Sequence, residues 1–132
     1  MHDGYTFVVT GASGGIGREI ALTLLSNGAN VSLAARSDGI QETAALSEAE
    51  RRALPVRTDV TDEEDVVGLI EETVDTFGGV DGVINNAGIA GPTSPIEDVE
   101  ADAWEKTMAV NAKGPFLVTK HAVSQLRESD RG

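Results

Sequence analysis

Residues 6–17 read TFVVTGASGGIG, and an apolar stripe continues beyond them to Leu25. The run Phe7-Val8-Val9 suits a buried parallel strand, because such a strand is apolar on both faces. Glycines follow the run in a G-x-x-x-G-x-G spacing. The next apolar residues recur at helical intervals, which is typical of an amphipathic helix. They are Ile16, Ile20, Ala21, Leu24 and Leu25.

A strand, a glycine turn and a helix in this order predict a dinucleotide site. Gly11, Gly15 and Gly17 have separate tasks: a tight turn, close approach of the backbone to a pyrophosphate, and close packing of helix on strand. The free N–H groups and the positive end of the helix then hold the phosphates. Glycine turns are common by themselves, so the flanking strand and helix carry this interpretation.

Length and composition indicate one globular domain. The chain has 132 residues, is 40% hydrophobic and contains no cysteine, which excludes disulfides and thiolate sites. No apolar run approaches the ~18 residues of a membrane span. The first residues, MHDGYT, lack the basic and apolar regions of a signal peptide, so we expect a cytoplasmic protein without a membrane partner.

The charge balance is strongly acidic. The 22 acidic residues outnumber the 10 basic ones, for a net charge of −12, and only three of the bases are lysine. The acids are spread along the chain like solvated helix faces, so we expect no metal site. A nucleic-acid partner is disfavoured because the field repels phosphate backbones. Such a surface favours a halophilic protein, since salt screens its self-repulsion; the alternative is a mildly acidic mesophilic one.

Strands and helices are expected to alternate. Strands are predicted over 5–10, 30–35, 54–58 and 80–85, and helices over 15–26, 40–53, 61–77 and 102–127. Asn27-Gly28 and Gly78-Gly79 are helix stops, and Thr61 with Glu64 forms a capping box. This order predicts an α/β fold, a doubly wound parallel sheet (Rossmann fold) of about four strands. Ligands of such sheets bind beyond the carboxyl ends of the strands.

Three more motifs follow the glycine turn. Asp59-Val60 comes after the third expected strand, Asn85-Asn86-Ala87-Gly88 after the fourth, and Val110-Asn111-Ala112-Lys113-Gly114-Pro115-Phe116 lies in the last helical segment. With Thr10-Gly11-Ala12-Ser13-Gly14-Gly15-Ile16-Gly17, they resemble, in order, the motifs of the short-chain dehydrogenase/reductase family. The resemblance covers essentially the whole chain but only the first half of the family's usual domain. The cofactor-binding residues it implies are Thr10, Gly11, Gly15, Ile16, Gly17, Asp59, Val60, Asn86, Ala87 and Gly88.

The resemblance implies an NAD(P)-dependent oxidoreductase that moves a hydride between a carbonyl and an alcohol. Asp59 would contact the adenine, and Asn111 would be the catalytic asparagine, which supplies orientation through its backbone and a bound water. Each motif also has a plain structural interpretation. Asp59 alone could cap a turn, Asn85-Asn86 could be turn residues, and Asn111 could be a polar break in a helix.

The rest of the family's catalytic set does not occur in the sequence. The family uses a tyrosine acid/base, a lysine four residues later and a serine on the preceding strand. Here the only tyrosine is Tyr5, with Val9 four residues on, and residues 129–132 read SDRG where the family's next strand would begin. We therefore expect the isolated chain to be inactive. Three hypotheses stay open: the cofactor-binding half of an oxidoreductase, a non-catalytic nucleotide-binding or interaction protein, and a structural module that keeps the glycine turn only for its shape.

The end of the second strand predicts NADP rather than NAD. An acid about 20 residues past the glycine motif takes the ribose 2′-hydroxyl, whereas an arginine accommodates a 2′-phosphate. Here the acid is missing and Arg36 stands 19 residues after Gly17. Ser37 and Ser13 add hydroxyls, while the charge of Asp38 weakens the prediction.

The last helix is also expected to support a homo-oligomer, since the family pairs this helix between subunits. Its apolar residues must cover the sheet as well, and periodicity does not separate core from interface. The candidate contact residues are Phe116, Leu117, His121, Ala122 and Leu126.

Overall fold

Four parallel strands form a single sheet in the order β3-β2-β1-β4. The computed structural model describes all residues from Met1 to Gly132. The strands are β1 (Thr6–Thr10), β2 (Asn30–Ala35), β3 (Ala53–Arg57) and β4 (Gly82–Ile84). Val8 lies opposite Ser32 of β2 and Val83 of β4, so β1 is central and β4 is an edge strand. The predicted α/β fold with a parallel sheet is confirmed.

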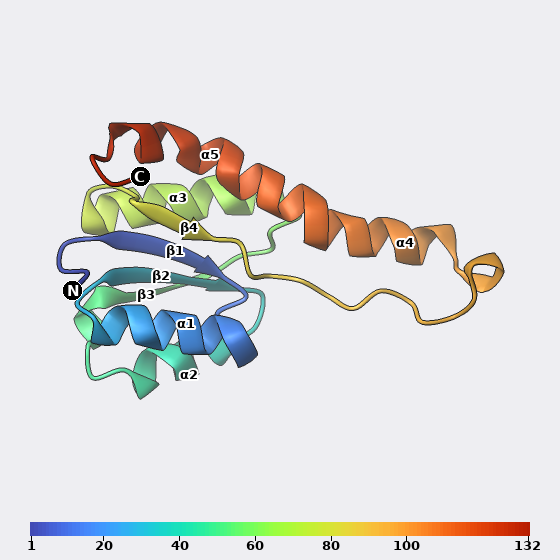
Figure 1. The fold of residues 1–132 in the computed structure, drawn as a ribbon, viewed down its shortest axis with the longest axis horizontal. Helices are drawn as coiled ribbons and strands as arrows, with labels where there is room; N and C mark the ends of the chain where they lie inside the picture. The colour runs from blue at the N-terminus through green and yellow to red at the C-terminus, as the bar shows by residue number, and fades with distance from the viewer.

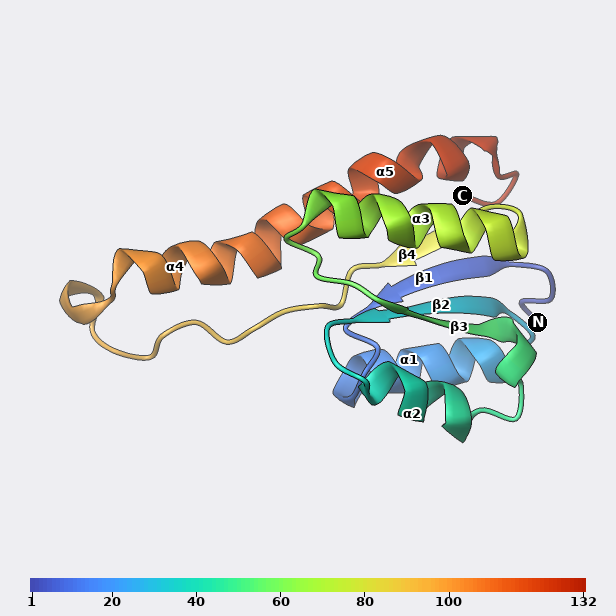
Figure 2. The ribbon, with the colours of Figure 1, turned by 180° about the vertical axis from the view of Figure 1, so that it is seen from behind.

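Helices cover both faces of this sheet. Figures 1 and 2 show α1 (Gly15–Ser26) and α2 (Gly39–Leu46) on one face, and α3 (Glu63–Phe77) and α5 (Gly114–Glu128) on the other. Helix α4 (Ala101–Met108) continues the line of α5 and extends away from the sheet. The two termini lie at the end of the sheet where the strands begin (Figure 1). No helix is both long and apolar enough to cross a membrane.

Two apolar layers explain why the central strands contain so few polar residues. On one side Val9 and Leu33 pack with Leu25 of α1, and on the other Val8 packs with Leu69 of α3. All five side chains are fully buried. The one buried polar contact between sheet and helix is satisfied, since the hydroxyls of Ser32 and Thr73 are 2.7 Å apart. Burial on both faces gives parallel strands their apolar runs.

The helix expected over 40–53 is wrong in its second half. Helix α2 ends at Leu46, and a single 3-10 turn (Glu50–Arg52) follows before β3. Ser47 has extended backbone, and its hydroxyl accepts a hydrogen bond from the N–H of Ala49 at 3.0 Å. Such a local serine turn competes with the helix for backbone donors, which explains the early end.

The predicted capping box at α3 is also wrong. Asp62 is the cap, and its carboxylate accepts from the N–H groups of Glu64 and Asp65. The Thr61 hydroxyl instead donates to Asp59, 2.7 Å away. The expected stop at the other end is confirmed, because Gly78 has a left-handed backbone with φ of 91°.

The predicted long helix over 102–127 contains a π-helical turn, Ala109–Lys113, between α4 and α5. Of the five candidate interface residues, Leu117 and Ala122 are buried inside the chain and are not free for a partner. Phe116 is exposed (61%), as are Trp104 (57%) and Met108 (41%) on α4. The sequence pattern did not separate Phe116 from the buried Leu117 and Ala122, because all three lie on α5.

Candidate functional site

The glycine turn joins the end of β1 to α1 at the carboxyl end of the sheet. Gly11 and Gly15 have left-handed backbones, with φ of 66° and 54°. A Cβ on Gly17 would lie 2.1 Å from the carbonyl oxygen of Gly11, so only glycine permits this closure. The turn thus has the sharp bend and the close helix–strand packing expected from its spacing.

The first turn of α1 is free to bind an anion. Its cap residue is Gly14, no side chain caps the N–H groups, and no acid lies in the first turn. Helix α3 differs, because Asp62 caps it and three acids occupy its first turn. Uncapped N–H groups at a helix start attract phosphate. Ile16, which follows Gly15, is 73% exposed, so it is not part of the core.

Thr10 holds the ends of β1 and β4 together. Its hydroxyl oxygen accepts hydrogen bonds from the N–H groups of Asn86 and Ala87, both at 3.0 Å. The Asn86 amide donates to the carbonyl of Gly11 at 3.3 Å. A Cβ on Gly11 would lie 2.8 Å from that amide nitrogen. The first and third sequence motifs therefore form one structural unit.

Arg36 and Ser37 follow β2 at the same edge, and both are exposed. The neighbouring Asp38, whose charge opposes phosphate binding, forms an ion pair with Arg57 at 2.9 Å. This pairing draws the Asp38 carboxylate toward β3. It leaves the Arg36 guanidinium without an ion-pair partner within the chain.

Asp59 forms an Asx turn. One carboxylate oxygen accepts from the N–H of Thr61 at 2.9 Å and from the hydroxyl of Thr61 at 2.7 Å. These hydrogen bonds lower the pKa of the Asp59 carboxyl, and the charge of Arg36 acts in the same direction. The structural interpretation of Asp59 thus holds, and a negative carboxylate still faces the site. Val60 beside it is buried against Val110.

A cavity of about 150 Å³ brings the motifs together at the ends of the strands. Its lining residues come from the glycine turn, from all three following strand ends and from the π-helical turn. They are Gly11, Ala34, Ala35, Arg36, Thr58, Asp59, Val60, Ala87, Gly88, Ile89 and Val110. Ser13 and Ser37 lie outside this lining, at the contact between the glycine turn and the start of α2.

Asn111 lies in the π-helical turn and fixes the loop after β4. Its amide oxygen accepts from the N–H of Ile89 at 2.8 Å, and its amide nitrogen donates to the Ile89 carbonyl at 2.9 Å. Single π-helical turns in α-helices often occur at functional sites. The sequence did not predict this turn or the role of Ile89, because no local pattern links positions 22 residues apart.

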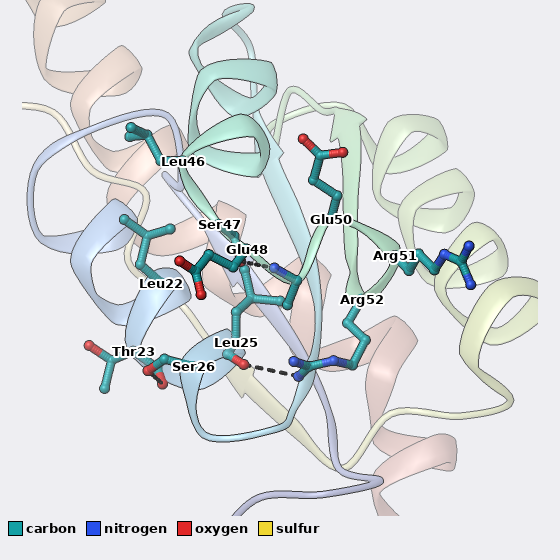
Figure 3. A pocket seen from close by; sticks show the side chains of 11 residues that line it. Leu22, Thr23, Leu25, Ser26, Leu46, Ser47, Glu48, Glu50, Arg51 and Arg52 are labelled. Carbon is teal, nitrogen blue, oxygen red and sulfur yellow. Dashed lines mark hydrogen bonds between the residues drawn. The ribbon is translucent and has the colours of Figure 1, made fainter.

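The largest hollow on the molecule lies elsewhere. It has a volume of about 1220 Å³ and lies between the C-terminal half of α1 and the segment from Leu46 to Arg52 (Figure 3). It is a wide, open depression at the opposite end of the sheet and contains none of the sequence motifs. Tyr5 also lies at that end, where the guanidinium of Arg131 stacks over its ring at 4.1 Å. Neither feature can serve a ligand at the carboxyl ends of the strands.

The family model of the short chain dehydrogenases matches residues 5–132. The chain belongs to this family. Its relatives include cis-4-hydroxycyclohexanecarboxylate dehydrogenase of Sinomonas cyclohexanicum, which is 39% identical over 126 residues, 95% of this chain and 51% of that protein. L-fucose dehydrogenase of Oryctolagus cuniculus is 38% identical over 96% of this chain and 44% of its own length.

Solved structures of short-chain dehydrogenases share the fold. The 3-ketoacyl-(acyl-carrier-protein) reductase of Brucella melitensis, crystallised in complex with NADH, superposes with a TM-score of 0.91 at 31% identity. The match covers 97% of this chain and 52% of that one. The chain thus spans about half the length of the short-chain dehydrogenases it matches.

Proposed function

We propose that this chain is the cofactor-binding part of an NADP(H)-dependent short-chain oxidoreductase, which moves a hydride between a carbonyl and an alcohol. The observation that carries the choice of NADP is Arg36. It directly follows β2, where NAD-binding chains of this fold place an acid, and Asp38, the next acid along the chain, is paired with Arg57. The proposal does not assign a substrate.

The site offers a separate group for each part of the cofactor. The uncapped N–H groups of α1 would hold the pyrophosphate, with Gly11 and Gly17 allowing its close approach. Arg36 and Ser37 would take the 2′-phosphate, helped by Ser13. Asp59 and Val60 would face the adenine, while Asn86, Ala87 and Gly88 would line the path toward the nicotinamide.

Calorimetric titration with NADPH and NADH tests the assignment. A hydrogen bond to a charged group contributes about 1.5–3 kcal/mol, so Arg36→Ala should weaken NADPH binding by about ten- to a hundredfold. NADH affinity should change little. Arg51→Ala is the matched control, since Arg51 is an exposed arginine at the far end of the sheet. Equal affinity of the unsubstituted chain for both cofactors, or NADPH binding that survives Arg36→Ala, would refute the proposal.

We expect the 132-residue chain to bind cofactor without turning over a substrate. General acid catalysis needs a group within hydrogen-bond reach of the substrate oxygen. The side-chain amide of Asn111 is hydrogen-bonded to the backbone of Ile89, and Tyr5 lies at the end of the sheet where the strands begin, away from the site. NADPH oxidation followed over a panel of aldehydes and ketones should stay at the buffer rate. Turnover that Asn111→Ala abolishes would contradict this expectation.

A further inference from the structure

We propose that Arg18 is a positioning residue which locks the glycine turn to the Arg36–Gly39 segment and so sets the preference for a 2′-phosphate. This inference rests on the proposed NADP site and names what holds that site in shape. Arg18 lies in the first turn of α1, and its side chain is 24% exposed. The sequence motifs assign it no role.

The Arg18 guanidinium joins segments that are far apart in sequence. Nη2 donates to the carbonyl of Ser13 at 2.6 Å and to the carbonyl of Gly39 at 3.2 Å. The same nitrogen lies 3.3 Å from the carboxylate of Glu42. One side chain thus holds a carbonyl of the glycine turn and a carbonyl at the start of α2.

Thr43 completes the connection from the other side. It is fully buried, its hydroxyl oxygen accepts from Nε of Arg18 at 2.9 Å, and the hydroxyl donates to the carbonyl of Ala12 at 2.7 Å. Buried donors and acceptors that pair in such a network fix a single geometry, because leaving any one of them unpaired is costly.

The two segments are in direct contact under this network. A Cβ on Gly39 would lie 2.8 Å from the carbonyl oxygen and 2.9 Å from the Cβ of Ser13. The N–H of Gly39 also points to the hydroxyl of Ser37, at 3.4 Å. Any opening of this contact therefore moves Ser37 and Arg36 relative to Ser13.

The network acts on the two cofactors unequally. NADH and NADPH share the pyrophosphate, which the N–H groups at the start of α1 serve in both. Only NADPH uses the Arg36–Ser37 segment for a phosphate, and recognition by a bidentate guanidinium depends on its geometry. A looser Ser13–Gly39 contact should therefore reduce NADPH affinity more than NADH affinity.

Titration of Arg18→Met tests the proposal, because methionine keeps an apolar stem and removes the donors. We expect NADPH affinity to fall about tenfold and NADH affinity by less than about threefold, in keeping with the loss of charged hydrogen bonds. The matched control is Arg52→Met. Arg52 also donates to two backbone carbonyls, those of Leu25 and Ala29 at 2.9 Å, but at the other end of the sheet. Figure 3 shows the bond to Leu25.

A second pair of variants covers the case in which Arg18→Met fails to fold. Thr43→Val removes the hydroxyl at nearly constant volume and should lower the ratio of NADPH affinity to NADH affinity, as Arg18→Met does. Thr43→Ser keeps the hydroxyl and should leave this ratio as it is in the unsubstituted chain. Amide hydrogen exchange of the cofactor-free chain should rise at residues 36–43 in Arg18→Met and stay level there in Arg52→Met.

The outcomes separate the two proposals. An unsubstituted chain that binds both cofactors equally would refute the NADP assignment, and with it this role of Arg18. A chain that prefers NADPH, and keeps that preference unchanged in Arg18→Met and Thr43→Val, would overturn the positioning role alone. Equal losses of NADPH and NADH affinity would likewise overturn it, because a purely structural role predicts them.

Discussion

Single atoms decide the geometry of the glycine turn. The carbonyl oxygen of Gly11 lies 2.1 Å from the position that a Cβ of residue 17 would take, and the amide nitrogen of Asn86 lies 2.8 Å from that of a Cβ of residue 11. These two close approaches come from different elements, β1 with α1 and β1 with the loop after β4. A side chain at either position would push apart the parts of the site that must meet around a dinucleotide.

Gly17→Ala is therefore expected to disrupt both folding and binding. Overpacking of this kind costs about 1–3 kcal/mol, and the displaced turn should weaken NADPH and NADH alike. Thermal melts and cofactor titrations measure the two effects. Gly68→Ala is the control, since Gly68 lies within α3 with open space around it, and should gain about 0.5–1 kcal/mol. A Gly17→Ala chain as stable as the unsubstituted one would contradict the packing argument.

At the scale of elements, α3 and α5 are joined by a charged contact over the same face of the sheet. Glu63 at the start of α3 accepts from Lys120 of α5 at 3.1 Å, and His121 lies 3.4 Å away. The hydrogen bond from Lys120 lowers the pKa of the Glu63 carboxyl, and the neighbouring His121 acts in the same direction. This contact links the first turn of α3 to the helix that carries the π-helical turn.

The contact should stabilise the fold in a pH-dependent way. Because folding lowers the pKa of Glu63, the stabilisation is complete above the carboxyl's ordinary pKa of 4.5 and is lost as the pH falls through the lower value of the folded chain. Glu63→Gln should thus melt below the unsubstituted chain at pH 5.5, and the two should converge toward pH 3. Asp59 titrates in both chains, so its contribution cancels.

Glu64→Gln is the control that separates the contribution of the ion pair to stability from that of the helix dipole. Glu64 shares the first turn of α3 but has no cationic partner. Its substitution should therefore shift the melting temperature less than Glu63→Gln does. A gap between Glu63→Gln and the unsubstituted chain that stays constant from pH 5.5 to pH 3 would show that the contact contributes through packing and not through charge.

At the scale of the whole molecule, most of the acidic charge has no partner. The chain has 22 acidic residues, and the ion pairs that involve arginine or lysine engage only Glu42, Asp38 and Glu63. Five of the seven arginines are in no ion pair, so few of the acidic side chains have a cation close enough to offset their mutual repulsion. The folded chain therefore carries a repulsion that salt can screen.

We accordingly expect stability to rise with salt. Screening shortens the range of the repulsion from about 10 Å at 0.1 M to about 3 Å at 1 M. The favourable acids at the start of α3 are screened too, but they act at one helix end while the repulsion sums over the surface. The melting temperature in 2 M potassium chloride should exceed that in 0.1 M, and a level or falling midpoint would refute the halophilic interpretation.

Association is the main competing cause of such a rise, because oligomers melt at higher temperature. The apolar side chains available for such association along α4 and α5 are Trp104, Met108 and Phe116, which are exposed. Light scattering in the same two buffers measures the molecular mass of the protein in solution. Our interpretation of the salt effect requires that this mass is the same in 0.1 M and 2 M potassium chloride. Sucrose, which favours burial without screening charge, is the second control.

The sequence by itself determined the elements and their order. The bounds of α1 and β2 match the prediction to the residue, since buried parallel strands are uniformly apolar, amphipathic helices have their own period and glycine marks the stops. The same local rules located the glycine turn, Arg36, Asp59 and the Asn86–Gly88 segment at the carboxyl ends of the strands. They failed where several local signals compete, as at Ser47 and at the Thr61–Asp62 cap.

Only the tertiary structure decided how these segments meet. Arg18 with Gly39, Asp38 with Arg57 and Asn111 with Ile89 are contacts between residues 19 to 22 positions apart, and no periodic pattern encodes them. The sequence identified Leu117 and Phe116 as equivalent apolar residues, yet packing buries the first and exposes the second. Local propensity acts along the chain, whereas the partner of a side chain depends on which helix lies on which face of the sheet.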